Sequence, residues 1–329
     1  MAPDHSSTRF RRLICSISQR IHSHNHPATQ NKPTVWNKLE GGNESVSSNS
    51  TSLRGKVALV TGSSKSTGAA IARALAAQGA SVVVNYSSDN KAAEEVAQQI
   101  NNASTTSSAL GSISPSNSTD PGTESGHTDH LSGKQQAITV KADSSTISGG
   151  KYLLQETLRM FGRLDILVLN AGLMGSKTLS EIDEDFFDAH FAVNVKAPLF
   201  LVKEAAEVME RPGGRIIFLS TSLTAASTLL PNALCYVASK GAVEQLSRVL
   251  AKDLGTQGFT VNTIAPGPVD TAIFRAGKPQ HVIDSIAAQI PSRRIAEPED
   301  IAPIVAFLAS PASQWINGQV LGVNGGYVV

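Results

Sequence analysis

The sequence predicts an α/β protein with a single Rossmann-type, doubly wound domain around a seven-stranded parallel sheet. One observation is a set of short apolar runs typical of strands, at 56–60, 81–86, 137–140, 165–170, 215–220, 259–266 and 319–323. Another is that helix-length segments separate these runs, and strands that alternate with helices indicate βαβ units and a parallel sheet. The last is a turn of small residues directly after the first run, where it opens a helix.

The segment between the first two runs has a helical pattern. Ile71, Leu75 and several alanines fall on one face of this helix, and Gly79 is the type of residue that ends one. The runs themselves are rich in Val, Ile and Leu, which suits strands covered by helices on both faces of a sheet.

Two segments interrupt this alternation. Residues 1–52 are rich in Ser, Asn, His and Thr without periodicity, so we expect a disordered leader. Residues from about 101 to 134 are nearly all small or polar, and we expect a disordered low-complexity insertion between the second helix and the third strand. The folded domain is then expected to span residues 53–329 around that insertion.

The composition excludes several function classes. The 329 residues carry a formal net charge of +1, which gives no reason to expect nucleic acid or an acidic membrane as a partner. No apolar run reaches the roughly 18–20 residues that span a bilayer. Cys15 and Cys235 are the two cysteines, and their unlike contexts favour a reducing compartment over a disulfide.

We therefore expect a cytoplasmic protein. The Arg- and Ser-rich start leaves a mitochondrial presequence as the lesser alternative, which Asp4 weakens. His22, His24 and His26 cluster without carboxylate or thiolate neighbours, so no metal site is predicted.

The turn after the first run reads TGSSKSTG over residues 61–68. Glycine allows a tight turn, and a helix N-terminus directs free N–H groups at the pyrophosphate of a dinucleotide. The spacing is similar to the T-G-x-x-x-G-x-G turn of short-chain dehydrogenases, with Gly62 and Gly68 in place and Ser66 where the middle glycine is usual. The Cβ of Ser66 narrows the approach to phosphate, whereas its hydroxyl could donate to a phosphate oxygen. Taken alone, the turn also fits an ordinary strand-to-helix loop.

Further motifs follow in a fixed order: NAG at 170–172, Asn194 within FAVNVKAPLF, YVASK at 236–240, PGPVDT at 266–271 and NGQVLGVNGG near the end. In this order and spacing they closely resemble the short-chain dehydrogenase/reductase family. The resemblance covers roughly residues 53–329 without the insertion, and it implies a Rossmann catalytic domain with oxidoreductase activity.

Tyr236 and Lys240 are the pair expected to carry the chemistry. They lie four residues apart, one turn along the same helical face. A phenol with a reference pKa of about 10 is a reluctant acid at neutral pH unless a nearby cation favours the phenolate. We therefore expect Lys240 to lower the pKa of Tyr236, which would act as general acid in reduction and general base in oxidation. The resemblance also implies that Lys240 binds the nicotinamide ribose hydroxyls.

The family places a serine near the end of the fifth strand to hold the substrate oxygen. Counting back from Tyr236 favours Ser222, whereas aligning from the strand favours Thr221, and neighbouring side chains point to opposite faces of a strand. We expect Ser222 to serve, with Thr221 as the alternative. Asn194 matches the family's active-site asparagine, which supports a water between the lysine and solvent; its other possible role is an amide bonded to backbone inside a helix.

The cofactor is expected to be NADP(H). NAD-specific Rossmann proteins usually carry an acidic residue after the second strand, but the stretch at 84–88 is neutral. No carboxylate there repels a 2′-phosphate, and Lys65 adds positive charge. We expect cofactor contacts from Lys65, Ser66, Asn85 and Ser87, together with Gly62 and Gly68 of the turn.

The resemblance implies further cofactor contacts beyond those of the turn. Asp143 matches the acidic residue near the adenine, and Asn170 should line the cofactor channel. Val269 and Thr271 should contact the nicotinamide carboxamide, while Tyr236 and Lys240 lie at the ribose.

The predicted function is an NADP(H)-dependent oxidoreductase that reduces a ketone or aldehyde, or oxidises the alcohol. The segment after Thr271 and the loop at 223–234 are largely apolar, which favours an uncharged substrate, although Arg275 and Lys278 leave an anionic group open. The stretches GRIIFLSTSLT at 214–224 and PGPVDTAIFRAGK at 266–278 resemble an aldehyde-reductase-like branch of fungal and plant oxidoreductases, whose members act on diverse carbonyls, including natural-product intermediates.

The alternative is an NADP(H)-binding sensor or scaffold without turnover, which the departures at Ser66 and Thr67 would favour. An intact Tyr236 and Lys240 pair argues against it. The family commonly forms homotetramers or dimers, so we expect a homo-oligomer here.

Overall fold

The apolar runs form one parallel sheet in the computed structural model, which describes residues 51–110, 135–227 and 229–329. Its seven strands confirm the predicted fold class. Most of the expected leader, residues 1–50, and residues 111–134 of the expected insertion lie outside the described residues. The strands are β1 (Val57–Val60), β2 (Ser81–Tyr86), β3 (Ala137–Lys141), β4 (Ile166–Leu169), β5 (Arg215–Leu219), β6 (Thr260–Pro266) and β7 (Val320–Val323).

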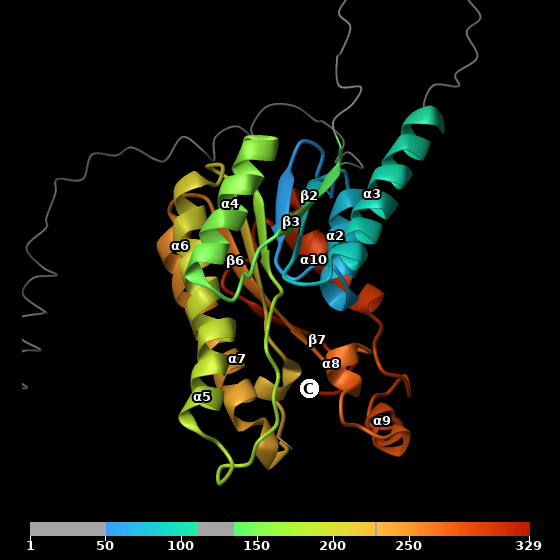
Figure 1. Ribbon diagram of the computed structural model, residues 1–329, viewed down its shortest axis with the longest axis vertical. Coiled ribbons are helices and arrows are strands. Elements are labelled where there is room, and N and C mark those ends of the chain that lie inside the picture. Colours follow the sequence, from blue (N-terminus) through green and yellow to red (C-terminus); the bar gives the residue numbers. More distant parts are fainter. Residues whose placement is uncertain (1–50, 111–134, 228) are drawn as a thin grey trace, which may run out of the picture. The chain divides into compact units, whose positions relative to one another are not determined.

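Helices cover both faces of the sheet. The longer helices are α2 (Ser66–Ala77), α3 (Asn90–Leu110), α4 (Ile147–Phe161), α5 (Glu184–Phe191), α6 (Ala197–Val208), α7 (Leu234–Gly255), α9 (Gln280–Ala287) and α10 (Pro298–Ala309); α8 (Ala272–Arg275) is a single turn. Figure 1 shows α2, α3 and α10 on one face and α4, α6 and α7 on the other, and each face has its own buried apolar cluster.

The strand order places a ligand crevice at a defined point. The order is β3-β2-β1-β4-β5-β6-β7. The chain passes from β3 at one edge to β4 beside β1, so the strand order reverses between β1 and β4. In open parallel sheets, ligands bind outside the carboxyl ends of the strands at such a switch point. Beyond this edge lie α8 and α9, which Figure 1 shows past the end of the sheet.

Helix α3 is longer than the sequence indicates. It continues to Leu110, whereas the polar insertion was expected to begin at about residue 101. The predicted start of the insertion is therefore wrong, because that stretch is still helical. The reason is tertiary: the Asn101 side chain accepts a hydrogen bond from the Ala137 N–H at 2.8 Å and donates to the Ala137 carbonyl at 3.0 Å. These two bonds attach the helix to the start of β3.

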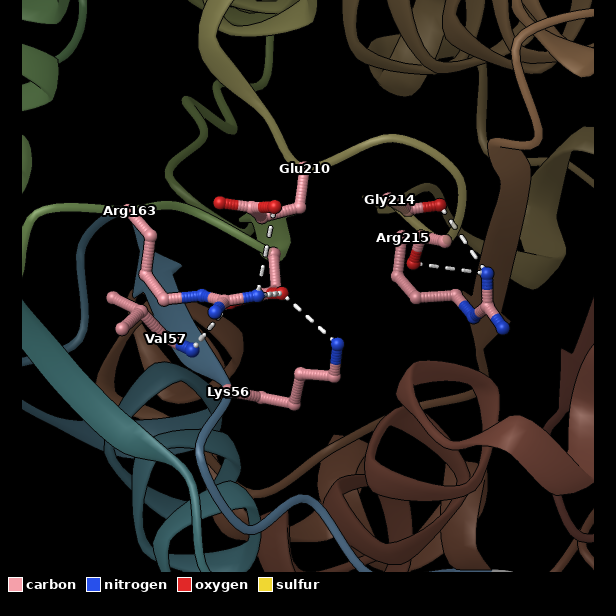
Figure 2. Close-up of polar contacts among 8 residues, drawn as sticks. Lys56, Val57, Arg163, Glu210, Gly214 and Arg215 are labelled. Carbon is pink, nitrogen blue, oxygen red and sulfur yellow. Dashed lines mark hydrogen bonds and ion pairs between the residues drawn. The ribbon is translucent and has the colours of Figure 1, made fainter.

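A charged cluster closes the opposite, amino-terminal edge of the sheet (Figure 2). Asp165, just before β4, is only 2% exposed, and its carboxylate accepts from Lys56 at 3.1 Å, from the Val57 N–H at 2.9 Å and from Arg163 at 2.7 and 2.8 Å. Burial works to raise the pKa of Asp165, but the hydrogen bonds from Arg163, Val57 and Lys56 together hold it below its usual value. A buried carboxylate with four donors joins β1 to β4.

Arg215, at the start of β5, lies beside this cluster and turns toward Gly214 in Figure 2. Its guanidinium donates to the carbonyls of Gly213 and Gly214, and burial lowers its pKa.

Among the residues that the structure describes, none of the helices combines the length and the apolar composition of a membrane span. In the same residues, no three His, Cys, Asp or Glu side chains gather as a metal site would require.

Candidate active site

The turn between β1 and α2 has the shape of an anion-binding site. The N-cap residue of α2, Lys65, makes no side-chain capping bond, so its own side chain does not occupy the first N–H groups of the helix. Ser66 has φ +52, in the left-handed region that favours glycine. The strain at this position explains why the family's turn has glycine there.

Glycine suits two positions of the turn, by its left-handed φ at residue 62 and by close approach at residue 68. A Cβ on Gly62, whose φ is +61, would lie 3.3 Å from Ala171, and one on Gly68 would lie 2.6 Å from the Asn170 amide nitrogen. The turn therefore packs directly against the NAG segment at the end of β4.

Asn170 fixes that packing. Its side chain donates to the carbonyls of Thr61 and Gly62, each at 3.0 Å, and its backbone N–H donates to the Thr61 hydroxyl at 3.0 Å. The amide nitrogen of Asn170 thus holds the turn, and its expected place in the cofactor channel stays a prediction.

Asn85 differs from expectation. It is 1% exposed, its side-chain oxygen accepts from the Gly62 N–H at 2.9 Å, and its nitrogen donates to the Val140 and Ala142 carbonyls at 3.3 and 3.0 Å. The prediction of a direct cofactor contact by this side chain is therefore wrong: the amide is buried beneath the turn and shapes it. Sequence reasoning missed this because the partners come from β1 and β3.

Three other predicted cofactor contacts are exposed around the turn. Lys65 and Ser87 are exposed at the carboxyl ends of β1 and β2. Asp143, after β3, is also exposed, and its carboxylate accepts from the N–H and hydroxyl of Ser145 at 3.0 and 2.6 Å.

Asn194 lies in a π-helical turn (Ala192–Lys196) between α5 and α6. Its oxygen accepts from the Leu173 N–H at 2.7 Å, and its nitrogen donates to the Leu173 carbonyl and the Ser239 hydroxyl, each at 2.9 Å. Its side chain therefore makes backbone bonds, which is the alternative that the sequence left open. π-helical turns occur frequently at functional sites.

Tyr236 and Lys240 lie on α7 at the carboxyl edge of the sheet. The Lys240 ammonium is buried and donates to the Leu219 carbonyl at 2.7 Å. A Cβ built on Gly172 would lie 3.3 Å from both this ammonium and the Asn194 oxygen. The structure thus brings the NAG segment, Asn194 and Lys240 together.

The electrostatics of the pair also differ from expectation. Burial raises the pKa of Tyr236, and a hydrogen bond from the Thr221 side chain works in the opposite direction. Burial lowers the pKa of Lys240 to about 8. The Lys240 ammonium, expected to lower the pKa of Tyr236, donates its hydrogen bond to the Leu219 carbonyl, and its effect on the tyrosine stays a prediction.

The hydroxyl next to Tyr236 is that of Thr221. Thr221 directly precedes a short 3₁₀ turn (Ser222–Thr224), and Ser222 is 4% exposed within that turn. The structure therefore pairs Thr221 with the phenol, while the expected role of Ser222 toward a substrate stays a prediction.

The segment after β6 carries the last predicted contacts. Val269 is buried and forms a bridge with Ala296, and the Thr271 hydroxyl caps α8 by accepting from the Phe274 N–H at 3.1 Å. Arg275 forms a two-bonded ion pair with Asp270, and Lys278 donates to the Phe274 carbonyl at 2.6 Å.

Glu244 is a residue that sequence reasoning missed. It lies one turn beyond Lys240 on α7, and its carboxylate accepts from the Ser220 and Thr224 hydroxyls, each at 2.7 Å. The spacing of four residues from Lys240 was available as a signal, but the hydroxyl partners come from the loop after β5.

Two parts of the chain match known families. Residues 56–113 match the family described as short chain dehydrogenase, and residues 118–328 match the one described as enoyl-(acyl carrier protein) reductase. The chain is 41% identical over 286 residues to NADPH-dependent aldehyde reductase 2, chloroplastic, of Arabidopsis thaliana, which covers 86% of this chain and 97% of that protein. It is 40% identical over 289 residues to the hydroxynaphthalene reductase-like protein Arp2 of Metarhizium brunneum, which covers 84% and 96%.

Solved structures with the same fold were also found. A dehydrogenase/reductase from Sinorhizobium meliloti has a TM-score of 0.72 and 33% identity, covering 85% of this chain and 97% of that one. A short chain dehydrogenase from Burkholderia cenocepacia, in complex with NADP, has a TM-score of 0.69 and 32% identity, covering 84% and 98%.

Proposed function

Because the chain belongs to the short-chain dehydrogenase/reductase family, we propose that it reduces an uncharged ketone or aldehyde with NADPH, or oxidises the alcohol with NADP⁺. The observation that carries this proposal is the position of Tyr236. Its phenol accepts a hydrogen bond from the Thr221 hydroxyl, and Tyr236 lies one helical turn from the buried Lys240. Both residues lie at the sheet edge that also carries the turn between β1 and α2.

The described residues fit NADP(H). Gly62 and Gly68 leave no room for a side chain in the turn, and the first N–H groups of α2 are not capped by Lys65. Lys65 and Ser87 would face the 2′-phosphate, and no carboxylate follows β2 at residues 87–88. The Arabidopsis relative is named for NADPH and the Burkholderia structure contains NADP, which supports the same choice here.

The proton step follows from the environment of Tyr236. Bound NADPH would supply a hydride to the carbonyl carbon. The substrate oxygen then takes a proton from the Tyr236 hydroxyl, which leaves a phenolate that the Thr221 hydrogen bond stabilises. Lys240, with a pKa of about 8, retains most of its charge at neutral pH and releases a proton more readily than an ordinary lysine, so it suits reprotonation of that phenolate.

The lining of the site supports an uncharged, apolar substrate. Arg275 and Lys278, which left an anionic substrate open, are each bonded within the chain. Leu229 and Leu230, in the loop between Thr221 and Tyr236, and Ile273, on α8, are large apolar side chains with 46%, 70% and 56% of their surface exposed. Exposed apolar side chains at the mouth of a site match a ligand that carries apolar surface.

Assembly and pathway are part of the same proposal. We propose a homodimer or homotetramer, as the family resemblance implies, and a cytoplasmic location. A role in secondary metabolism is proposed from the same resemblance. A sensor or scaffold remains the second candidate, favoured by the strained Ser66 in the cofactor turn.

The test is a carbonyl screen with NADPH. Purified protein is given NADPH and benzaldehyde, cyclohexanone, tetralone or phenanthrenequinone, and NADPH absorbance is followed. Tyr236→Phe should abolish turnover and keep NADPH affinity, measured by fluorescence titration, while Tyr152→Phe on the exposed face of α4 should leave both unchanged. NADPH binding without turnover of any carbonyl would favour the sensor.

A second comparison assigns the substrate-binding hydroxyl. Ser222→Ala should lower kcat/KM by about 10-fold to 100-fold if this hydroxyl holds the developing oxyanion. An unchanged kcat/KM in Ser222→Ala, with a large loss in Thr221→Val, would assign that role to Thr221.

A further inference from the structure

Three bonded positions on one face of α7 hold the loop that follows β5. Tyr236 receives a hydrogen bond from Thr221, Lys240 donates to the Leu219 carbonyl, and Glu244 accepts from the loop hydroxyls. Successive spacings of four residues place all three on the same face of the helix. The first two belong to the site described above, and the third has no part in it so far.

The Glu244 carboxylate brackets Thr221. One of its oxygens accepts from Ser220 on the strand side and from Thr224 on the far side, each at 2.7 Å. The Thr224 hydroxyl also lies 2.8 Å from the Thr221 carbonyl oxygen. Glu244 therefore holds Thr221 from both sides in the chain, and it belongs to α7, the helix that carries Tyr236.

We propose that Glu244 is a positioning residue, whose carboxylate fixes the segment 220–224 against α7 so that the Thr221 hydroxyl meets Tyr236. This inference rests on the proposed function. Hydroxyl bonds to a carboxylate are charge-assisted and stronger than neutral ones. Without Glu244, the Ser220 hydroxyl keeps only the Lys240 carbonyl at 3.4 Å as an acceptor, and the Thr224 hydroxyl keeps the Thr221 carbonyl of its own loop at 2.8 Å. Loss of Glu244 therefore releases the loop at two points.

Two effects of removing Glu244 have opposite signs at Tyr236. The loss of a nearby negative charge would by itself favour the phenolate and lower the tyrosine pKa. The loss of the Thr221 hydrogen bond removes a group that stabilises the phenolate and raises that pKa. The direction of the shift therefore separates positioning from simple electrostatics.

The experiment compares pH profiles of kcat in reduction of whichever screened carbonyl the wild type turns over. Reduction needs protonated Tyr236, so the rate falls as pH rises through its apparent pKa. For Glu244→Ala we expect kcat lower by about 10-fold and the alkaline limb moved upward by roughly half a unit or more. Thr221→Val should move the limb in the same direction, and the double variant should add no further shift.

Two further variants serve as controls. Glu244→Gln keeps an acceptor oxygen for both hydroxyls but loses the charge, so it should restore most of kcat and leave the alkaline limb at the wild-type position or below it, never above it. Asp253→Ala removes an exposed carboxylate from the same helix and should change neither. Urea unfolding of each variant shows whether the protein folds.

The outcomes distinguish this inference from the proposed function. A downward shift in Glu244→Ala, an unchanged profile, or fully additive shifts in the double variant would overturn the positioning role while turnover stands. If the wild type turns over no carbonyl, the proposed function fails first; a crystal structure of folded Glu244→Ala then decides, and Thr221 still bonded to Tyr236 would overturn the inference.

Discussion

The Lys240 ammonium donates a 2.7 Å hydrogen bond to the Leu219 carbonyl oxygen, and this bond joins α7 to the end of β5. Lys240 is 5% exposed, and burial lowers its pKa from 10.5 to about 8. Between these two pH values the unfolded chain binds a proton that the folded protein has released. The free energy of unfolding therefore rises with pH across this interval, by about 3 kcal/mol from this group alone.

Lys240→Met should accordingly stabilise the protein at neutral pH while it abolishes turnover. The gain should be about 1–2 kcal/mol, because relief of the buried charge is offset in part by loss of the bond to Leu219. Urea unfolding measures it, and the difference from wild type should narrow as pH rises above 8. Lys252→Met, at an exposed position of α7, is the control; a Lys240→Met protein that is less stable at every pH would contradict the prediction.

Asp165→Asn should destabilise the protein by about 3 kcal/mol, because Lys56 and Arg163 lose a buried anionic partner. The folded pKa of Asp165 is depressed, so its stabilisation is complete above the unfolded pKa and is lost as pH falls through the folded value. Urea midpoints of wild type and variant should converge in acid. Glu299→Gln, which breaks an exposed pair with Arg73, should cost less than about 0.5 kcal/mol. Equal kcat/KM is expected for all three proteins, since this cluster lies at the edge opposite the site.

Ser66→Gly should raise stability by about 1 kcal/mol, since glycine adopts the left-handed φ of +52 without strain. Ser66→Ala keeps the strain and removes only the hydroxyl, so its stability should match the wild type. If the hydroxyl contacts a phosphate, Ser66→Ala should bind NADPH more weakly, and Ser66→Gly should lose less affinity because it also removes the Cβ that narrows the approach to phosphate. Wild-type affinity in both would show that the hydroxyl makes no such contact.

Ser87→Asp should reverse the cofactor preference. A carboxylate at the exposed end of β2 repels a 2′-phosphate and accepts from the ribose hydroxyls of NADH, so KM for NADPH should rise at least about 10-fold. Steady-state kinetics with both cofactors measures the ratio. A wild type that already prefers NADH would contradict the assignment on which the variant rests.

The parts of the molecule that depend on local pattern were predictable from sequence. Strand runs such as Val57–Val60 and the spacing of Tyr236 and Lys240 are set by neighbours in the chain, and the structure has both. The tight turn between β1 and α2 was also predictable, because glycine and a helix start lie next to each other in sequence; its binding of phosphate stays a prediction.

The parts that depend on distant partners were not predictable. Asn85 was expected to contact the cofactor, yet its amide bonds to Gly62 in the turn after β1 and to carbonyls of the β3 region. The end of α3 was misplaced because Asn101 bonds to Ala137, and the role of Glu244 depends on hydroxyls of another element. Each case is a side chain whose hydrogen-bonding partner lies more than twenty residues away or on another strand.

Because of the π-helical turn at Ala192–Lys196, the number of residues between α5 and α6 matters as much as the side chains that they carry. Its wider turn holds one extra residue, which sets α5 and α6 out of phase by about 100° relative to a continuous α-helix. A one-residue, in-frame deletion here would restore regular helical hydrogen bonding and keep nearly every side chain, but it would rotate α5 relative to α6 and disturb the turn that holds Asn194 against Leu173. Relatives that differ in helix length at this point should therefore be far rarer than relatives that differ in residue type.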